Sequence, residues 1–178
     1  MKTSLYGMAL ETFVPMLRNL SAFLDKAAEH ARAKGGDPDA FVTARLAPDM
    51  FPLSFQVQFA CDQARNCAAR LMDKEPAKFE DTEQTLAGLK ARIDKTLDYL
   101  AGASAAAFEG AEERIIEMPL QDPLVLKANG LQFLRDWTLP NFYFHVVTAY
   151  DILRHEGVEL GKRDFMSHAG ALIGPRGG

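Results

Sequence analysis

Apolar residues recur every three or four positions along four long stretches of the chain, and this spacing predicts four amphipathic helices. The stretches are residues 4–33, 54–73, 81–100 and 140–156. Pro140 suits the first turn of a helix and Gly157 suits the residue just past a helix end, so these residues bound the fourth helix. Asp81 or Thr82 is expected to cap the third. The pattern therefore predicts an all-α bundle whose helices pack antiparallel or nearly so.

A different pattern separates the third and fourth helices. Residues 114–118 and 124–127 are short β-type runs, and the segment between them contains Pro119 and Pro123. Two such runs joined by a turn predict a small β-hairpin. A short helix over residues 131–137 is expected to lead from the hairpin into the fourth long helix.

The remaining connections are long, but one domain accounts for the whole chain. Residues 37–53 contain three prolines and are expected to form a connection with one helical turn near residues 41–45. Pro15 lies inside the first helix, where the loss of one backbone hydrogen bond predicts a kink and not a break. A chain of 178 residues fits a single domain, assigned to residues 1–168, and residues 169–178 are expected to form a flexible tail.

The charge distribution excludes several classes of partner. The net charge is −4, and the longest basic cluster is Lys162 with Arg163, so the chain lacks the basic surface that binds nucleic acid. No segment approaches the roughly 20 apolar residues that a membrane span needs. The first residues do not have the pattern of a secretory signal. We therefore expect a cytoplasmic protein that binds neither nucleic acid nor membrane.

The two cysteines, Cys61 and Cys67, are six residues apart in the second predicted helix. A rise of ~1.5 Å per residue separates their backbones by about 9 Å, which is more than a disulfide spans. Both are expected to be buried, reduced thiols.

Three motifs carry a resemblance to a known superfamily. They are FPLSFQVQFACDQA at residues 51–64, LPNFYFHVVTAYDILRHEGV at 139–158 and GKRDF at 161–165. With these motifs the chain resembles the DinB/YfiT-like superfamily of four-helix bundles, and more closely a branch whose members are labelled domains of unknown function. The resemblance covers nearly the whole chain. It implies a DinB-like four-helix bundle with the small β-hairpin inserted between helices three and four.

The resemblance also implies a metal site. In the wider superfamily, one histidine of the second helix and an H-x-x-x-H pair of the fourth bind a divalent ion such as nickel, zinc or manganese. Some members are thiol-dependent transferases or hydrolytic enzymes.

This chain departs from that histidine pattern. The fourth-helix pair reads Asn141 and His145, and the second-helix position falls at Gln56 or Gln58, followed by Asp62. Amide oxygens are weak ligands for zinc or nickel. We therefore expect no tightly held cofactor, although His145 and Asp62 can still hold a divalent Ni, Zn or Mn ion weakly.

Four polar residues and one tyrosine form the expected ligand site. Gln58 and Asp62 are one helical turn apart, as are Asn141 and His145, so the two pairs can face each other across the bundle. Tyr143 is a further candidate because its hydroxyl can line a pocket. Such a cluster either binds a ligand or forms a buried polar network that fixes the helix register.

Three functions follow from these residues. The leading hypothesis is binding of a small molecule in a polar cleft between helices, with the superfamily metal site degenerate. The first alternative is a metal-dependent hydrolase or thiol transferase in which His145 and Asp62 hold the ion. The second is a structural or dimerising protein, because an apolar helix face can also pair with a second copy as a homodimer. The sequence contains no nucleophile-elbow serine and no Gly-rich phosphate loop.

Overall fold

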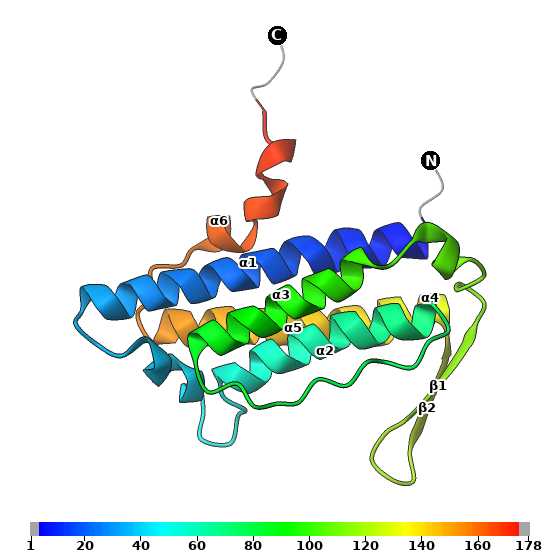
Figure 1. Cartoon of the computed structure of the whole chain (residues 1–178), viewed down its shortest axis with the longest axis horizontal. Coiled ribbons are helices and arrows are strands. Elements are labelled where there is room, and N and C mark those ends of the chain that lie inside the picture. The colour runs from blue at the N-terminus through cyan, green and yellow to red at the C-terminus, as the bar shows by residue number, and fades with distance from the viewer. Residues whose placement is uncertain (1–3, 175–178) are drawn as a thin grey trace.

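The computed structural model describes residues 4–174, which form a bundle of four long helices (Figure 1). The long helices are α1 (Leu5–Ala33), α2 (Leu53–Leu71), α3 (Leu86–Ala101) and α5 (Leu139–His155). The contacts of α2 with α5 are the most extensive between any two elements. The expected all-α bundle with a small hairpin insert is confirmed.

Helix α1 is one continuous helix of 29 residues that passes through Pro15 without a break. Ser4 caps it, because its Oγ accepts a hydrogen bond from the backbone N–H of Gly7 at 3.1 Å. Its buried stripe packs against α5, where the rings of Phe13 and Phe142 meet edge to face at 5.0 Å between centroids. The first helix thus forms one wall of the core.

The segment between α2 and α3 differs from the expectation. Thr85 caps α3, since its Oγ1 accepts the Gly88 N–H at 2.9 Å, whereas Asp81 or Thr82 was the expected cap. Asp81 instead pairs with Arg92 at 2.8 Å, which draws it away from the helix start. Residues 73–85 therefore form an extended strap.

The strap also determines the direction in which α3 runs. Figure 1 shows it running back along the length of α2, so that α3 begins beside the start of α2. Helices α2 and α3 consequently run in the same direction, whereas an antiparallel arrangement throughout was expected. A long crossover connection of this kind is a known variation in four-helix bundles.

The short elements lie close to their expected positions. The 3₁₀ helix η1 (Pro38–Thr43) is the helical turn in the first connection, and a second 3₁₀ turn, η2 (Ala105–Phe108), follows α3. The predicted hairpin is confirmed as β1 (Ile115–Pro119) and β2 (Val125–Asn129), which pair antiparallel with Glu117 opposite Lys127. In Figure 1 the hairpin projects from the side of the bundle, near the end where α4 lies.

The chain enters α5 without an interruption, unlike the separate short helix that was expected. The helix α4 (Gly130–Gln132) passes into the π-helical segment η3 (Phe133–Thr138) and then directly into α5. Pro140 lacks the N–H that would continue an ordinary α-helical ladder, and the wider π turn lies just before it. Gly130 is required at the entry, because a Cβ there would lie 1.9 Å from the carbonyl oxygen of Ala111.

The C-terminal segment packs along α1, where a buried asparagine and an ion pair between Lys26 and Asp164 at 2.7 Å contact it. After α6 (Lys162–Phe165), Asn19 donates from Nδ2 to the Phe165 carbonyl at 2.8 Å and accepts from the Ser167 hydroxyl at 2.6 Å. Part of the expected tail forms the 3₁₀ helix η4 (Ser167–Leu172), and residues 175–178 of that tail lie outside the described part. Among the helices described, none combines the length and the apolar character needed to cross a bilayer.

Candidate functional site at His145

The structure divides the expected site residues between two sides of α2. At ~100° of rotation per residue, Gln58 lies about 160° around the helix from Gln56, and Asp62 lies about 120° from it. Gln56 points to α5 and contacts His145, whereas Gln58 and Asp62 contact the strap and α3. The prediction that Gln58 and Asp62 face His145 is therefore wrong.

A hydrogen bond joins His145 of α5 to Gln56 of α2. His145 Nδ1 lies 2.9 Å from Gln56 Oε1, and Gln56 Nε2 donates to the Phe51 carbonyl at 2.9 Å. The second bond fixes the orientation of the amide, so its oxygen faces the imidazole. Nδ1 must then carry the proton, and Nε2 carries a lone pair.

The imidazole is neutral at physiological pH. Desolvation by burial lowers the pKa of His145 to about 4. Its ring lies 5.0 Å from the ring of Phe59 and 5.3 Å from that of Phe144, measured between centroids. Within residues 4–174, no hydrogen bond to Nε2 is formed. His145 thus offers a hydrogen-bond acceptor among aromatic rings.

The other two candidates on α5 have local roles. Asn141 donates from Nδ2 to the carbonyl of Trp137 at 2.7 Å, one turn earlier, at the end of the π-helical segment. Tyr143 is 38% exposed, and its ring packs edge to face on Phe142 at 5.8 Å. Burial of part of the ring raises the pKa of the Tyr143 hydroxyl.

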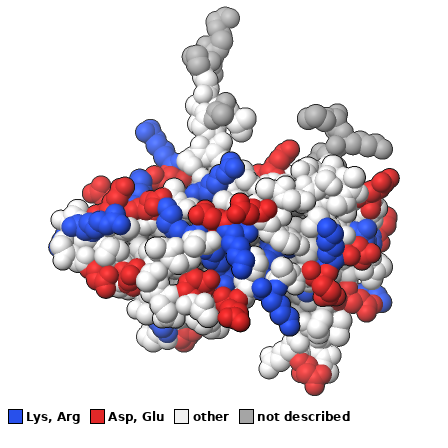
Figure 2. Space-filling model, viewed as in Figure 1, with Lys and Arg blue, Asp and Glu red and all other residues white. Residues whose placement is uncertain are grey.

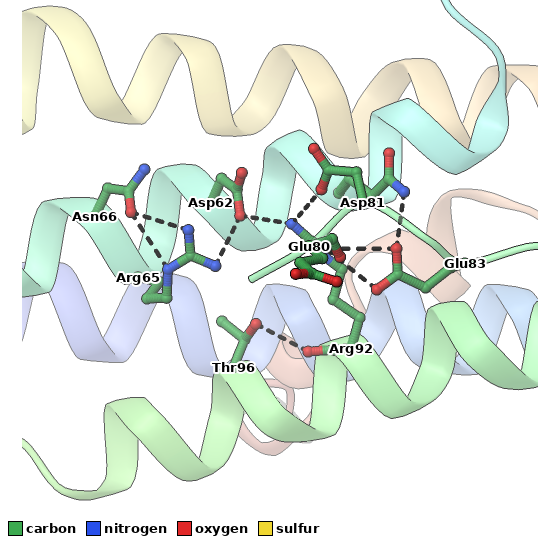
Figure 3. Close-up of polar contacts among 9 residues, drawn as sticks. Asp62, Arg65, Asn66, Glu80, Asp81, Glu83, Arg92 and Thr96 are labelled. Carbon is green, nitrogen blue, oxygen red and sulfur yellow. Dashed lines mark hydrogen bonds and ion pairs between the residues drawn. The ribbon is translucent and has the colours of Figure 1, made fainter. Parts of the chain in front are cut away.

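On the opposite side of α2, Arg92 is the centre of a charged network (Figure 3). Its side chain is 1% exposed and pairs with Asp62 at 2.8 Å, Asp81 at 2.8 Å and Glu83 at 3.1 Å. Burial alone would lower the pKa of Arg92, but the charges of Asp62 and Glu83 outweigh it and raise the pKa. Arg65 adds a second cation 2.9 Å from Asp62.

This network attaches the strap to the bundle. Gln58 donates to Glu83 at 2.8 Å, and Phe79 of the strap lies between Arg65 and Lys95, with cation-to-ring distances of 4.2 and 4.0 Å. Gln58 and Asp62 therefore hold residues 73–85 in place. Arg92 was not among the site residues expected from the sequence, although a charged residue on the same helix face as Leu89 and Thr96 was a usable signal.

The residues present do not fit the metal site that the superfamily resemblance implies. Among residues 4–174, no three His, Cys, Asp or Glu side chains come close enough to hold an ion. The carboxylate of Asp62 is paired with two guanidinium groups, and His145 uses Nδ1 for Gln56. One imidazole nitrogen with amide oxygens is a poor ligand set for nickel, zinc or manganese.

Both thiols are buried, as expected. Burial raises the pKa of Cys61 and of Cys67 to about 12. The thiolate is the nucleophilic form of cysteine. Neither thiol is therefore suited to act as a nucleophile.

Comparison with known proteins places this fold in a family. Residues 5–166 match the family described as Domain of unknown function (DUF1993). The chain belongs to the DUF1993 family. A DinB family member protein from Shewanella denitrificans, solved by crystallography, shares 41% sequence identity with this DUF1993 chain and superposes with a TM-score of 0.86. The match covers 98% of this chain and 95% of that one. The curated proteins contain no match.

The family assignment supports the resemblance seen in the sequence. A DinB-like bundle of the DUF1993 family is thus established for this chain, and the chemistry of its site has to be argued from its own residues. The structure also distinguishes the two glutamines between which the resemblance to the superfamily left the second-helix position open. Gln56, and not Gln58, is the glutamine of α2 that contacts His145.

Proposed function

We propose that this DUF1993 family member binds a small organic molecule at the Gln56–His145 pair, without a metal ion. The ligand class is a planar or apolar molecule that carries one hydroxyl or amino donor. The observation that carries the proposal is the hydrogen bond from His145 to Gln56, which leaves Nε2 as an acceptor between Phe59 and Phe144.

The chemistry of the pair supports this ligand class. The low pKa of His145, about 4, keeps the imidazole uncharged, so it attracts a neutral donor more than an anion. The neighbouring Phe rings favour the flat face of an aromatic molecule. A few fixed polar groups within an apolar surround are the usual composition of small-molecule sites.

The metal-dependent alternative has less support. In this proposal the superfamily metal site is degenerate, because Gln56 and Asn141 stand where the resemblance implies histidines, and Asp62 is held by arginines. Protein purified without an affinity tag or chelator should contain nickel, zinc and manganese far below one ion per chain. A stoichiometric amount of any of these metals would contradict this part of the proposal.

Two matched probes test the binding site directly. In an NMR titration, p-cresol should bind about fivefold more tightly than toluene, since one hydrogen bond contributes ~1 kcal/mol. His145→Leu should abolish this difference, whereas His155→Leu, an exposed position on the same helix, should keep it. Equal affinities for both probes in the unsubstituted protein would rule out Nε2 as the acceptor.

A further inference from the structure

An aromatic surface surrounds the candidate site and faces solvent. We define the α2–α5 face as the side chains of Phe51, Phe55, Phe59, Tyr143, Phe144 and Val147. Phe51 and Phe144 are 56% and 57% exposed. A contiguous group of exposed apolar side chains on a folded protein commonly marks an interaction surface.

The phenylalanine rings of this face are connected through His145. Phe51 stacks on Phe55 at 5.2 Å, Phe55 contacts Phe59 at 5.8 Å, and Phe59 lies 5.0 Å from His145, whose other neighbour is Phe144. The contacts therefore run from the start of α2 across to α5. His145 links the three rings on the α2 side to Phe144 of α5.

A neighbouring part of the surface has a different character. Acidic and basic side chains are interspersed over the face of the molecule drawn in Figure 2, where α3 and the strap lie toward the viewer. By contrast, none of the six residues that define the α2–α5 face is charged. A partner that docks by charge, such as an anionic lipid surface or an acidic protein, has no cation to bind on these six residues.

We propose that two copies of this chain pair through the α2–α5 face about a two-fold axis, and that the second copy covers the His145 site. A two-fold axis places the same rings on both sides of the contact. Aromatic rings pack well against other aromatic rings, so the surface is complementary to itself. The second part of the proposal rests on the proposed function.

The area of the face agrees with a dimer contact. At 150–250 Å² per aromatic side chain, the exposed fractions leave roughly 400 Å² of apolar surface on each copy. Apolar atoms make up about 65% of a homodimer interface, so the full contact would bury about 1,200 Å² from both copies. This value lies at the lower end of the range of about 1,200–2,000 Å² for stable protein interfaces.

A second copy would also complete the ligand site. Small-molecule sites typically bury at least 70% of their ligand, and a ring lying on the open side of Phe59 and Phe144 would stay largely in water. Rings of the partner copy would cover that exposed side. Ligand affinity should therefore rise with the fraction of dimer.

The assembly is tested on the full chain with two exposed apolar positions. In sedimentation velocity, the unsubstituted chain should form a species of twice its 19.7 kDa mass at tens of micromolar. Phe51→Asp should raise the dimer dissociation constant at least tenfold. Leu124→Asp, at a 62% exposed position of the hairpin, should leave it unchanged. Circular dichroism should show both variants folded.

Three outcomes would overturn the pairing. They are a monomeric unsubstituted chain, a Phe51→Asp variant that still dimerises, and a Leu124→Asp variant that becomes monomeric. The ligand readout uses Val147→Asp, because Phe51 orients Gln56 and packs on Phe59, whereas Val147 is a 40% exposed position of the face without a hydrogen bond or ring contact in the site. Weaker p-cresol binding by Val147→Asp than by Leu124→Asp supports closure of the site by the second copy. Equal p-cresol binding by the two variants would contradict closure of the site by the second copy, but not the proposed ligand binding. A chain that dimerises and binds no p-cresol would contradict the proposed ligand binding, but not the dimer.

Discussion

The Nδ1 atom of His145 lies 2.9 Å from the side-chain oxygen of Gln56, and this contact joins the two helices that pack most extensively in the bundle. The glutamine is itself oriented by its bond to the Phe51 carbonyl. The imidazole is thus fixed in one tautomer, with Nε2 left as an acceptor.

The pH dependence of stability should report the burial of His145. Its pKa falls from 6.5 to about 4 on folding, so the unfolded chain takes up this proton first as the pH drops. The contribution of the neutral His145 to the free energy of unfolding is fully present above pH 6.5. It decreases toward pH 4, by up to about 3 kcal/mol. Urea unfolding at pH 7 and pH 4.5 measures the difference. His145→Leu should show a smaller loss between these pH values, and an identical loss would contradict the shift.

Replacement of the amide partner should change the charge state of the histidine. In Gln56→Glu, a carboxylate would face Nδ1 and favour the imidazolium, so the pKa of His145 should rise by about 1 to 3. The pKa is measured by NMR titration of the ring. His155, an exposed residue on the same helix, provides the internal control, and its ring signal should be the same in the variant and in the unsubstituted protein. An unchanged His145 pKa would show that the glutamine does not contact it in solution.

The Arg92 network should hold the strap in place. Arg92→Ala leaves Asp62, Asp81 and Glu83 without their shared partner and should cost about 3 to 5 kcal/mol. Lys90→Ala, on the same helix, breaks only a surface pair with Asp25 and should cost less than about 1 kcal/mol. Trypsin should cleave Arg92→Ala after Lys74 or Lys78 in the strap faster than it cleaves the control. Equal cleavage rates in the two variants would show that the Arg92 network does not hold the strap in place.

The helical periods predicted the fold because burial of an apolar stripe determines where helices form. The hairpin and the start of α1 were also predicted, because the turn residues and the cap that mark them lie next to them in the sequence. The strap was not predicted, because Asp81 pairs with Arg92, eleven positions away, and does not cap the helix. Sequence alone does not show such a competition between a helix cap and a buried ion pair.

The candidate site was predicted in part. His145 was found, but its partner was assigned to the side of α2 that carries Gln58 and Asp62. Both faces of α2 are buried, one by α5 and one by α3, so apolar periodicity does not tell which polar residue faces which neighbour. The pairing of Asp62 with Arg65 and Arg92 depends on tertiary packing, which only the structure provides.

The most direct test of the proposed site is the ¹⁵N resonance of the two ring nitrogens of His145 at pH 7, recorded with and without p-cresol. In the free protein Nδ1 should be protonated and Nε2 unprotonated, and the Nε2 resonance should shift when p-cresol is added. Toluene should leave that resonance nearly unchanged. A protonated Nε2, or an Nε2 resonance that responds to zinc and not to p-cresol, would contradict the account.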